Sequence, residues 1–157
     1  MKKTVELEQL VYSELNEEKK AFLKEAKIGS KLSYAPYSKF YVGCAVSLAD
    51  GEIVHGANQE NASFPSGLCA ERVALFQCAK NLENKIEKIA VFAHSQQYEV
   101  PDPLVPCAGC LQVISDIRNR QQQAIEIWLW DGAESVYRAD DVSTFLPFHF
   151  ELKDKTS

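Results

Sequence analysis

The sequence predicts an α/β protein, in which helices cover a sheet, and two observations carry this prediction. Stretches with apolar residues at helical spacing alternate along the chain with short apolar stretches that are typical of strands. Two pairs of expected strands are separated by an Asp-Gly dipeptide, Asp50-Gly51 and Asp131-Gly132, a frequent sequence of tight hairpins. Because a hairpin joins antiparallel strands, we expect a mixed sheet rather than a purely parallel one.

Size and composition fit one domain of this class, which we expect to span residues 1–157. Of the 157 residues, 46% are hydrophobic and 25% are charged, an ordinary globular mixture. The net charge of -5 disfavours a nucleic-acid partner, because phosphate recognition needs clustered positive charge. No apolar run reaches the length of a membrane helix, and acidic residues stand where a signal peptide has its apolar core. We therefore expect a cytoplasmic protein with no membrane partner.

The first expected elements lie before Pro36. Residues 4–12 alternate weakly in polarity, and this pattern fits either an edge strand or a short helix. Asn16 is a candidate N-cap, followed by Glu17 and Glu18, which suit the positive end of a helix dipole. The sequence thus predicts a first helix that begins after Asn16 and is stopped by Pro36.

The remaining elements follow in alternation. Strands are expected over residues 40–48, 52–57, 89–93, 124–130 and 135–137, which gives a sheet of five. A second helix is expected over about residues 69–81, with Val73, Ala74 and Phe76 among its apolar positions. A third helix is expected from Pro106, a residue favoured in the first turn, to about Arg118.

Three of the five cysteines form a candidate metal site. An odd number of cysteines without a secretory signal disfavours a disulfide framework. Cys107 and Cys110 are three residues apart and share one helix face, while Cys69 begins another helix. Three thiolates suit zinc and leave its fourth position open, as in catalytic sites. A Cys-x-x-Cys pair alone would also fit structural zinc or a redox pair. Cys44 and Cys78 are expected to be buried packing residues.

Glu71 follows Cys69 by two residues, in the first turn of the expected second helix. A carboxylate beside zinc and a water molecule is suited to moving protons, without itself being a ligand. Alone, Cys-Ala-Glu would be an ordinary buried segment. A Cys-x-Glu element followed by Pro-Cys-x-x-Cys is the signature of zinc-dependent deaminases.

Further motifs make the resemblance more specific and cover about residues 34–150. In chain order they are Tyr34-Ala35-Pro36-Tyr37-Ser38-Lys39-Phe40, Asn58-Gln59-Glu60-Asn61-Ala62-Ser63, Gly67-Leu68-Cys69-Ala70-Glu71-Arg72 and Pro106-Cys107-x-x-Cys110. In this order they resemble the small cytidine deaminases. The resemblance implies a three-layer α/β/α subunit with a mixed five-stranded sheet and one zinc ion per chain. It also implies hydrolytic deamination of cytidine and deoxycytidine by a homotetramer, or alternatively a homodimer.

The resemblance further implies roles for single residues. Glu71 is the expected general acid and base, and Arg72 donates hydrogen bonds to the ligand sulfurs. Asn58 and Glu60 bind the ribose hydroxyls; in an extended segment they would indeed point to one face. The other expected substrate-binding residues are Phe40, which packs on the pyrimidine, Phe64, Ala70 and, from a neighbouring subunit, Phe150.

Two positions depart from the family pattern. Leu111 stands where an arginine usually follows the last cysteine, and Phe64 stands where tyrosine is common. They leave open a deaminase of another aminopyrimidine nucleoside or of an antibiotic. The acidic charge and the Asp131-Gly132 hairpin disfavour a polynucleotide deaminase. Glu71 disfavours a non-catalytic zinc-stabilised binding protein, because a structural site needs no carboxylate beside an open coordination position.

Overall fold

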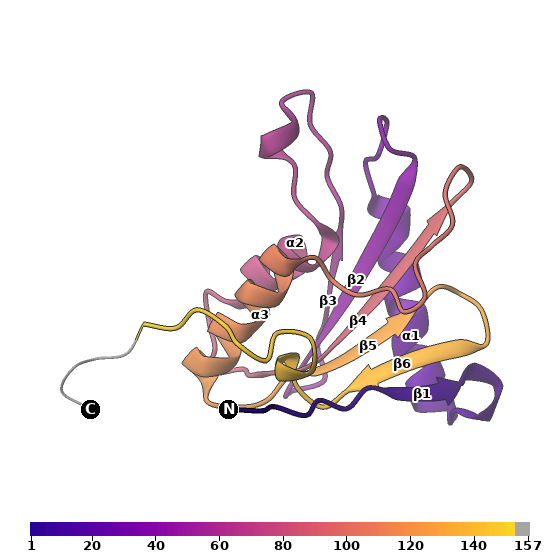
Figure 1. Ribbon diagram of the computed structural model, residues 1–157. Coiled ribbons are helices and arrows are strands. Elements are labelled where there is room, and N and C mark those ends of the chain that lie inside the picture. The colour runs from indigo at the N-terminus through magenta and orange to yellow at the C-terminus, as the bar shows by residue number, and fades with distance from the viewer. Residues whose placement is uncertain (153–157) are drawn as a thin grey trace.

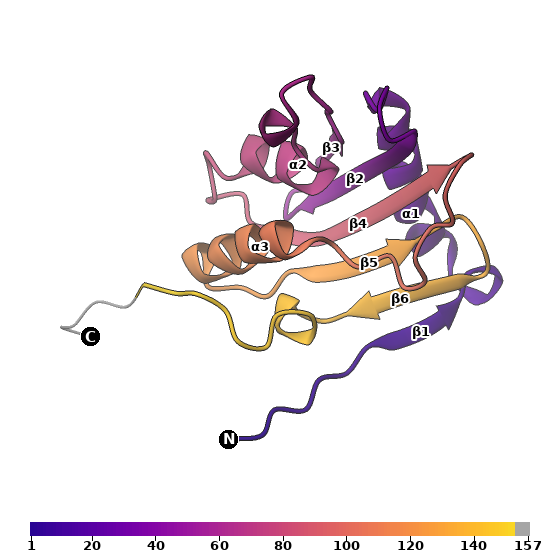
Figure 2. The ribbon, with the colours of Figure 1, turned by 45° about the horizontal axis from the view of Figure 1, so that its top comes forward.

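The computed structural model describes residues 1–152 and has a mixed six-stranded sheet between two layers of helices (Figures 1 and 2). The strand order is β1-β6-β5-β4-β2-β3, with β4 and β5 parallel and all other neighbours antiparallel. The strands are β1 (Glu8–Val11), β2 (Phe40–Leu48), β3 (Ile53–Ala57), β4 (Ile86–Ser95), β5 (Glu126–Trp130) and β6 (Ser135–Ala139). The predicted α/β/α class is confirmed, but the predicted number of five strands is wrong, because β1 adds a sixth.

Helix α1 (Glu17–Gly29) covers one face of the sheet. The Asn16 side chain accepts a hydrogen bond of 2.9 Å from Lys19 N, so the predicted cap is confirmed. The helix ends at Gly29 and not near Pro36, because its last turn lies directly against β2. A Cβ atom on Gly43 would lie 2.1 Å from Ala26 O, so this close approach requires glycine.

Helices α2 (Ala70–Cys78) and α3 (Ala108–Gln121) cover the opposite face (Figure 2). Their buried side chains, such as Leu75 and Ile114, pack with the β4 and β5 side chains Ile89 and Ile127 in the larger core cluster. Phe76, one of the apolar positions expected on this helix, is 52% exposed, because α2 buries the stripe through Ala74, Leu75 and Cys78 instead. Cys44 and Cys78 are buried as predicted.

The start of α2 is fixed against strand β3 by Gly56. A Cβ atom on Gly56 would lie 2.3 Å from Ala70 O and 2.6 Å from Ala74 N, so any other residue would push the helix away. This approach sets where the N-terminus of α2 lies relative to the sheet. It also places Cys69 and Glu71 close to the ends of β2 and β3.

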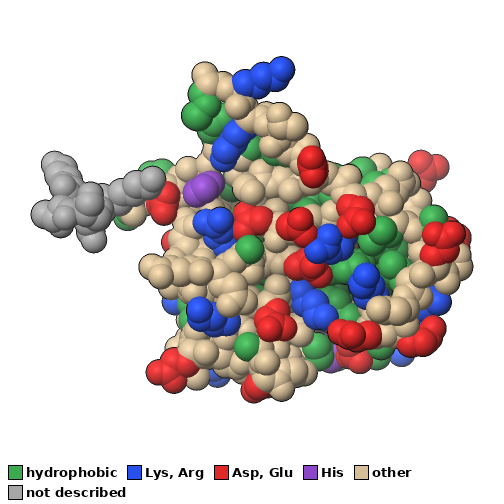
Figure 3. All heavy atoms as spheres, turned by 90° about the horizontal axis from the view of Figure 1, so that it is seen from below, with side chains coloured by type: hydrophobic (Ala, Val, Ile, Leu, Met, Phe, Trp, Pro, Cys, Tyr) green, Lys and Arg blue, Asp and Glu red, His purple; other side chains and the backbone are tan. Residues whose placement is uncertain are grey.

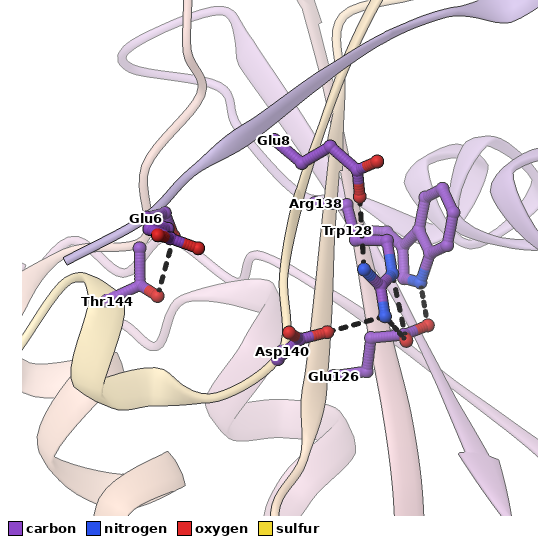
Figure 4. A network of polar contacts seen from close by, with 7 residues as sticks. All are labelled: Glu6, Glu8, Glu126, Trp128, Arg138, Asp140 and Thr144. Carbon is purple, nitrogen blue, oxygen red and sulfur yellow. Dashed lines mark hydrogen bonds and ion pairs between the residues drawn. The ribbon is translucent and has the colours of Figure 1, made fainter.

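The segment that the sequence left undecided forms β1 and a following 3₁₀ turn over Tyr12–Glu14. β1 pairs with β6, so that Glu8 lies opposite Arg138. The Arg138 guanidinium binds Glu126 and Asp140, each at 2.6 Å, and Glu8 at 3.1 Å (Figure 4). The ring of Tyr12 stacks on a β5 tryptophan, with centroids 4.7 Å apart. The N-terminal segment therefore covers an edge that β6 would otherwise expose.

Acidic and basic side chains are interspersed over the face seen from below in Figure 3. This face therefore carries no extended positive surface of the kind that binds nucleic acids. Within residues 1–152, no helix combines the length and the apolar character that crossing a membrane requires.

Candidate metal centre and adjoining pocket

Three cysteine sulfurs meet where the N-termini of α2 and α3 come together. Cys69 is the N-cap of α2, Cys107 is the N-cap of α3, and Cys110 lies in the first turn of α3. Their sulfur atoms all lie within 4.8 Å of one another. Because the positive ends of two helix dipoles point toward this cluster, they favour the thiolate form that a metal needs.

The donor set fits one zinc ion. Zinc–sulfur bonds of about 2.3 Å at tetrahedral angles place two sulfurs about 3.8 Å apart. The Cys69–Cys107 and Cys107–Cys110 sulfur distances are 3.7 and 3.5 Å. No fourth His, Cys, Asp or Glu of residues 1–152 joins this group, so one coordination position stays open to a small molecule.

Hydrogen bonding in the cluster already favours a thiolate. The pKa of Cys69 is lowered, first because Cys110 donates a hydrogen bond to its sulfur and then because Arg72 and Cys107 do. The same interaction with Cys69 raises the pKa of Cys110. The Arg72 guanidinium lies with Nη2 3.6 Å from the Cys69 sulfur. Arg72 is thus the cation in direct contact with the sulfurs.

Glu71 lies beside the sulfurs but outside the group of mutually close ligand atoms. Its side chain is in the first turn of α2, borders the pocket and is nearly buried, with 4% exposed. Burial is the main reason that its pKa is raised to about 7. A carboxyl group with a pKa near neutrality can both accept and return a proton during a reaction.

A cavity of about 630 Å³ opens beside the sulfurs. Seven of the predicted site residues line it, and they are Phe40, Asn58, Glu60, Phe64, Cys69, Glu71 and Cys107. Two predicted substrate-binding residues do not line it. Ala70 is fully buried in the core, and Phe150 is 71% exposed on the C-terminal segment beyond α3 (Figure 1). Among residues 1–152, the lining contains the carboxyl groups of Glu60 and Glu71 and no Lys, Arg or His.

The cavity wall away from the sulfurs is formed by Asn58 and Glu60. Oδ1 of Asn58 accepts hydrogen bonds from Val42 N and from Ser33 Oγ, and Nδ2 donates to the carbonyl of Phe40. These contacts keep the side chain at the end of β2. The polar side chain that holds Asn58 thus comes from a serine to which the sequence analysis gave no role.

The Glu60 carboxylate is held in a similar way. It accepts hydrogen bonds from the amides of Tyr37 and Ser38, at 2.9 and 3.2 Å, and from Ser38 Oγ. Partial burial raises the pKa of Glu60, but these hydrogen bonds outweigh burial and the pKa is lowered. Sequence reasoning also missed the role of Ser38. Its position in the Tyr34–Phe40 motif was the one available signal.

Leu111, which departs from the family pattern, is a packing residue. It follows Cys110 on α3, is 5% exposed and belongs to the larger core cluster. An arginine here would have to leave this apolar site to reach a sulfur. The structure therefore explains Leu111 by its burial and not by a change at the metal centre.

Comparison with known proteins identifies relatives of this fold and site. The family model described as the cytidine and deoxycytidylate deaminase zinc-binding region matches residues 16–125. A cytidine deaminase from Halalkalibacterium halodurans is 37% identical over 100 residues, which cover 64% of this chain and 72% of that protein. One from Sporosarcina psychrophila is 37% identical over 97 residues, or 62% of this chain and 68% of the relative. The crystal structure of cytidine deaminase from Burkholderia pseudomallei matches with a TM-score of 0.69 and 31% identity, covering 87% of this chain and 100% of that chain.

Proposed function

Because the chain belongs to the cytidine and deoxycytidylate deaminase family, we propose that it is a zinc-dependent cytidine deaminase. It hydrolyses cytidine and deoxycytidine to uridine and deoxyuridine and releases ammonia. One observation carries the proposal: a group of three sulfurs that fits zinc reaches the wall of one cavity through Cys69 and Cys107, beside the buried carboxyl group of Glu71.

Cys69, Cys107 and Cys110 would hold the metal, and a bound zinc ion supplies Lewis acidity that makes water a nucleophile at neutral pH. Glu71 takes one proton from the attacking water and gives it to the ring nitrogen. It then takes the second proton from the oxygen now bound to the ring carbon and gives it to the amine, which leaves as ammonia while that oxygen becomes the carbonyl of uridine. The pKa of Glu71, near 7, suits both directions of transfer. Arg72 offsets negative charge through its contact with the Cys69 sulfur.

The cavity lining supports a nucleoside rather than a nucleotide as substrate. A phosphate group would meet no cation among the lining residues and would be repelled by Glu60, whose pKa is lowered. Phe40 presents an aromatic surface to a pyrimidine ring, and Asn58 and Glu60 present polar atoms to a ribose. The same acidic lining argues against a polynucleotide substrate.

A homotetramer is proposed as the active assembly, in which Phe150 reaches the site of a neighbouring subunit. Its support is the exposure of aromatic side chains on one chain: Phe76 is 52%, Phe148 62% and Phe150 71% exposed. Large apolar side chains left open in this way are typical of surfaces that contact a protein. Sedimentation or light scattering of the purified protein tests the assembly.

The test of function is a steady-state assay of the purified protein against cytidine, deoxycytidine, cytosine and deoxycytidine monophosphate. We expect uridine or deoxyuridine and ammonia from the two nucleosides and little turnover of the monophosphate. Preferential turnover of the monophosphate would contradict the proposed substrate class. No turnover by protein that contains one zinc per chain would instead support a non-catalytic zinc-stabilised binding protein.

A further inference from the structure

The amide group of Asn58 is held by three contacts within the chain. Oδ1 accepts hydrogen bonds from Val42 N, at 2.9 Å, and from Ser33 Oγ, while Nδ2 donates to Phe40 O at 2.9 Å. A backbone N–H can only donate and a backbone carbonyl can only accept. The amide of Asn58 therefore has one allowed orientation, since turning it over would break both backbone contacts.

The Ser33 hydroxyl determines which atoms of Asn58 remain free. An amide oxygen has two lone pairs, and Val42 N and Ser33 Oγ together occupy both. An amide nitrogen has two hydrogens, and Phe40 O takes one of them. Toward the cavity, Asn58 is thus left with one donor and no acceptor. Ser33 itself does not line the cavity and acts through Asn58.

Glu60, which lines the same cavity, provides a hydrogen-bond acceptor where Asn58 provides a donor. One carboxylate oxygen accepts from the Tyr37 and Ser38 amides, and the other accepts from Ser38 Oγ and keeps a free lone pair. The wall therefore offers a donor from Asn58 and an acceptor from Glu60. A sugar hydroxyl, which can accept one hydrogen bond and donate another, matches this pair.

We infer that Ser33 is a positioning residue for sugar recognition: by filling the second lone pair of Asn58 Oδ1, its hydroxyl makes Asn58 a pure donor toward the nucleoside hydroxyls. The inference rests on the proposed function, because it concerns how this cavity binds the sugar of the nucleoside. Without the Ser33 hydroxyl, Oδ1 regains an acceptor and the side chain loses one of its anchors. Binding of a hydroxyl-bearing sugar should then weaken.

The backbone around Ser33 is held without its hydroxyl, so removing that group should leave the wall in place. Ser33 N donates to Ser30 O at 3.1 Å, and Tyr34 N donates to Asn58 O at 3.0 Å. Glu60 N in turn donates to Tyr34 O at 2.8 Å. These bonds tie the segment before Pro36 to the segment that carries Asn58 and Glu60. Ser33→Ala therefore tests the hydroxyl alone.

The experiment compares Ser33→Ala with the wild type on two nucleosides that differ only in the sugar hydroxyl that can bind to Asn58. For deoxycytidine we expect KM to rise about 3- to 10-fold with little change in kcat, as for a contact present in both ground and transition states. For 2′,3′-dideoxycytidine, which lacks the 2′ and 3′ hydroxyls, we expect an unchanged inhibition constant, measured by competition against deoxycytidine turnover. Ser33→Thr keeps the hydroxyl and should restore the wild-type KM.

Ser30→Ala is the matched control. Its hydroxyl lies in the same 3₁₀ turn, Ser30–Leu32, but donates to Lys27 O at 2.7 Å, away from the cavity. Both constants should stay at their wild-type values in this variant. An equal loss of affinity for both nucleosides in Ser33→Ala, or no loss for either, would overturn the inference. Absence of cytidine turnover by the wild type would instead overturn the proposed function, so the two failures are distinguishable.

Discussion

The two ends of the pocket, one at the three cysteines and one at Asn58 and Glu60, differ in how fully contacts within the chain satisfy their polar groups. At the sulfur end, the polar contacts of Cys69, Cys107 and Cys110 are with one another and with Arg72, and three thiolates need a cation to balance their charge. At the other end, where we propose that the sugar binds and which is called the sugar end below, backbone amides, a carbonyl and two serines form most of the hydrogen bonds that Asn58 and Glu60 can make. The sulfur end therefore depends on an added ion, whereas the sugar end is preorganised before any ligand binds.

Removal of a metal ligand should have the largest effect, because the sulfur end depends on a bound ion. Cys110→Ser should bind no zinc, lose all measurable deaminase activity and unfold at a lower temperature, because zinc binding to the folded chain stabilises it. Elemental analysis, which should find one zinc per wild-type chain, and thermal unfolding measure these effects. Cys78→Ser is the control, since that buried thiol bonds Ala74 O and lies outside the cluster. Wild-type activity in a zinc-free variant would contradict the role of the sulfurs.

Glu71→Gln should separate proton transfer from metal binding at the same end. Glutamine has nearly the same shape but cannot carry a proton, so kcat should fall by about 10²–10⁴-fold. Zinc content and melting temperature should stay close to the wild-type values, because Glu71 is not part of the sulfur cluster. Activity within a few-fold of the wild type would remove Glu71 from its proposed role.

Leu111→Arg tests whether a charge introduced at the buried residue next to Cys110 changes the metal centre or only the packing of the core. A buried arginine without a partner should lower the free energy of unfolding by about 3 kcal/mol, through lost packing and an uncompensated charge. Denaturant unfolding measures this loss, and Leu111→Met, which conserves volume, should cost under about 1.5 kcal/mol. The pH–rate profile should not move. An unchanged melting temperature together with an acidic limb shifted to lower pH would show that charge, not packing, matters here.

Glu60→Gln should break the sugar end without affecting zinc. The new amide would keep its oxygen toward the amides of Tyr37 and Ser38 and turn its NH2 toward Ser38 Oγ, so the cavity wall would lose the acceptor that the second carboxylate oxygen offers. We expect kcat/KM for deoxycytidine to fall about 10- to 100-fold, mainly through KM. The inhibition constant of 2′,3′-dideoxycytidine should change much less. A loss of zinc from this variant would mean that the two ends are not independent.

Phe64→Tyr should have the smallest effect. The ring of Phe64 is 73% exposed and contacts Tyr37 edge to face, with centroids 5.4 Å apart. An added hydroxyl there should change the free energy of unfolding by no more than about 0.5 kcal/mol. It should raise kcat/KM for cytidine less than about 10-fold, the value of one hydrogen bond. A marked drop in melting temperature would show that this exposed ring is a structural contact.

The sulfur end could be predicted from sequence because it consists of two short local motifs, and the deaminase signature joins them across 38 residues. Cys107 and Cys110 are one helical turn apart, and Glu71 follows Cys69 by two residues, so local spacing carries the geometry. The sugar end could be predicted only in part. Ser33 lies 25 residues before Asn58, and no local pattern links the two. The hydrogen bond from Ser33 to Asn58 Oδ1 can be recognised only in the folded structure, where β2 brings the two residues together.

The same reasoning explains the other differences between expectation and structure. The strand at Glu8–Val11 was undecided because it is a short edge strand with mostly exposed side chains, so its sequence alternates only weakly, and its pairing with the distant β6 leaves no local signal. Phe76 was one of several apolar positions expected on α2, and periodicity alone did not choose which of them face the core. The end of α1 depended on the approach to Gly43, a contact between elements that the sequence does not record.

The pairing of β1 with β6 also has a consequence for how the chain is made. Arg138 binds Glu8 across 130 residues of sequence, so during synthesis β1 must wait for a partner strand that is made 130 residues later. At about 5–20 residues per second, this interval is roughly 6 to 26 s. During this time the strand is exposed while the inner strands β2, β3 and β4 can already pair with one another. The edge strand β1 is therefore the last strand to join the sheet. It can pair with β6 only after residues 135–139 have been synthesised, when the other five strands are already present.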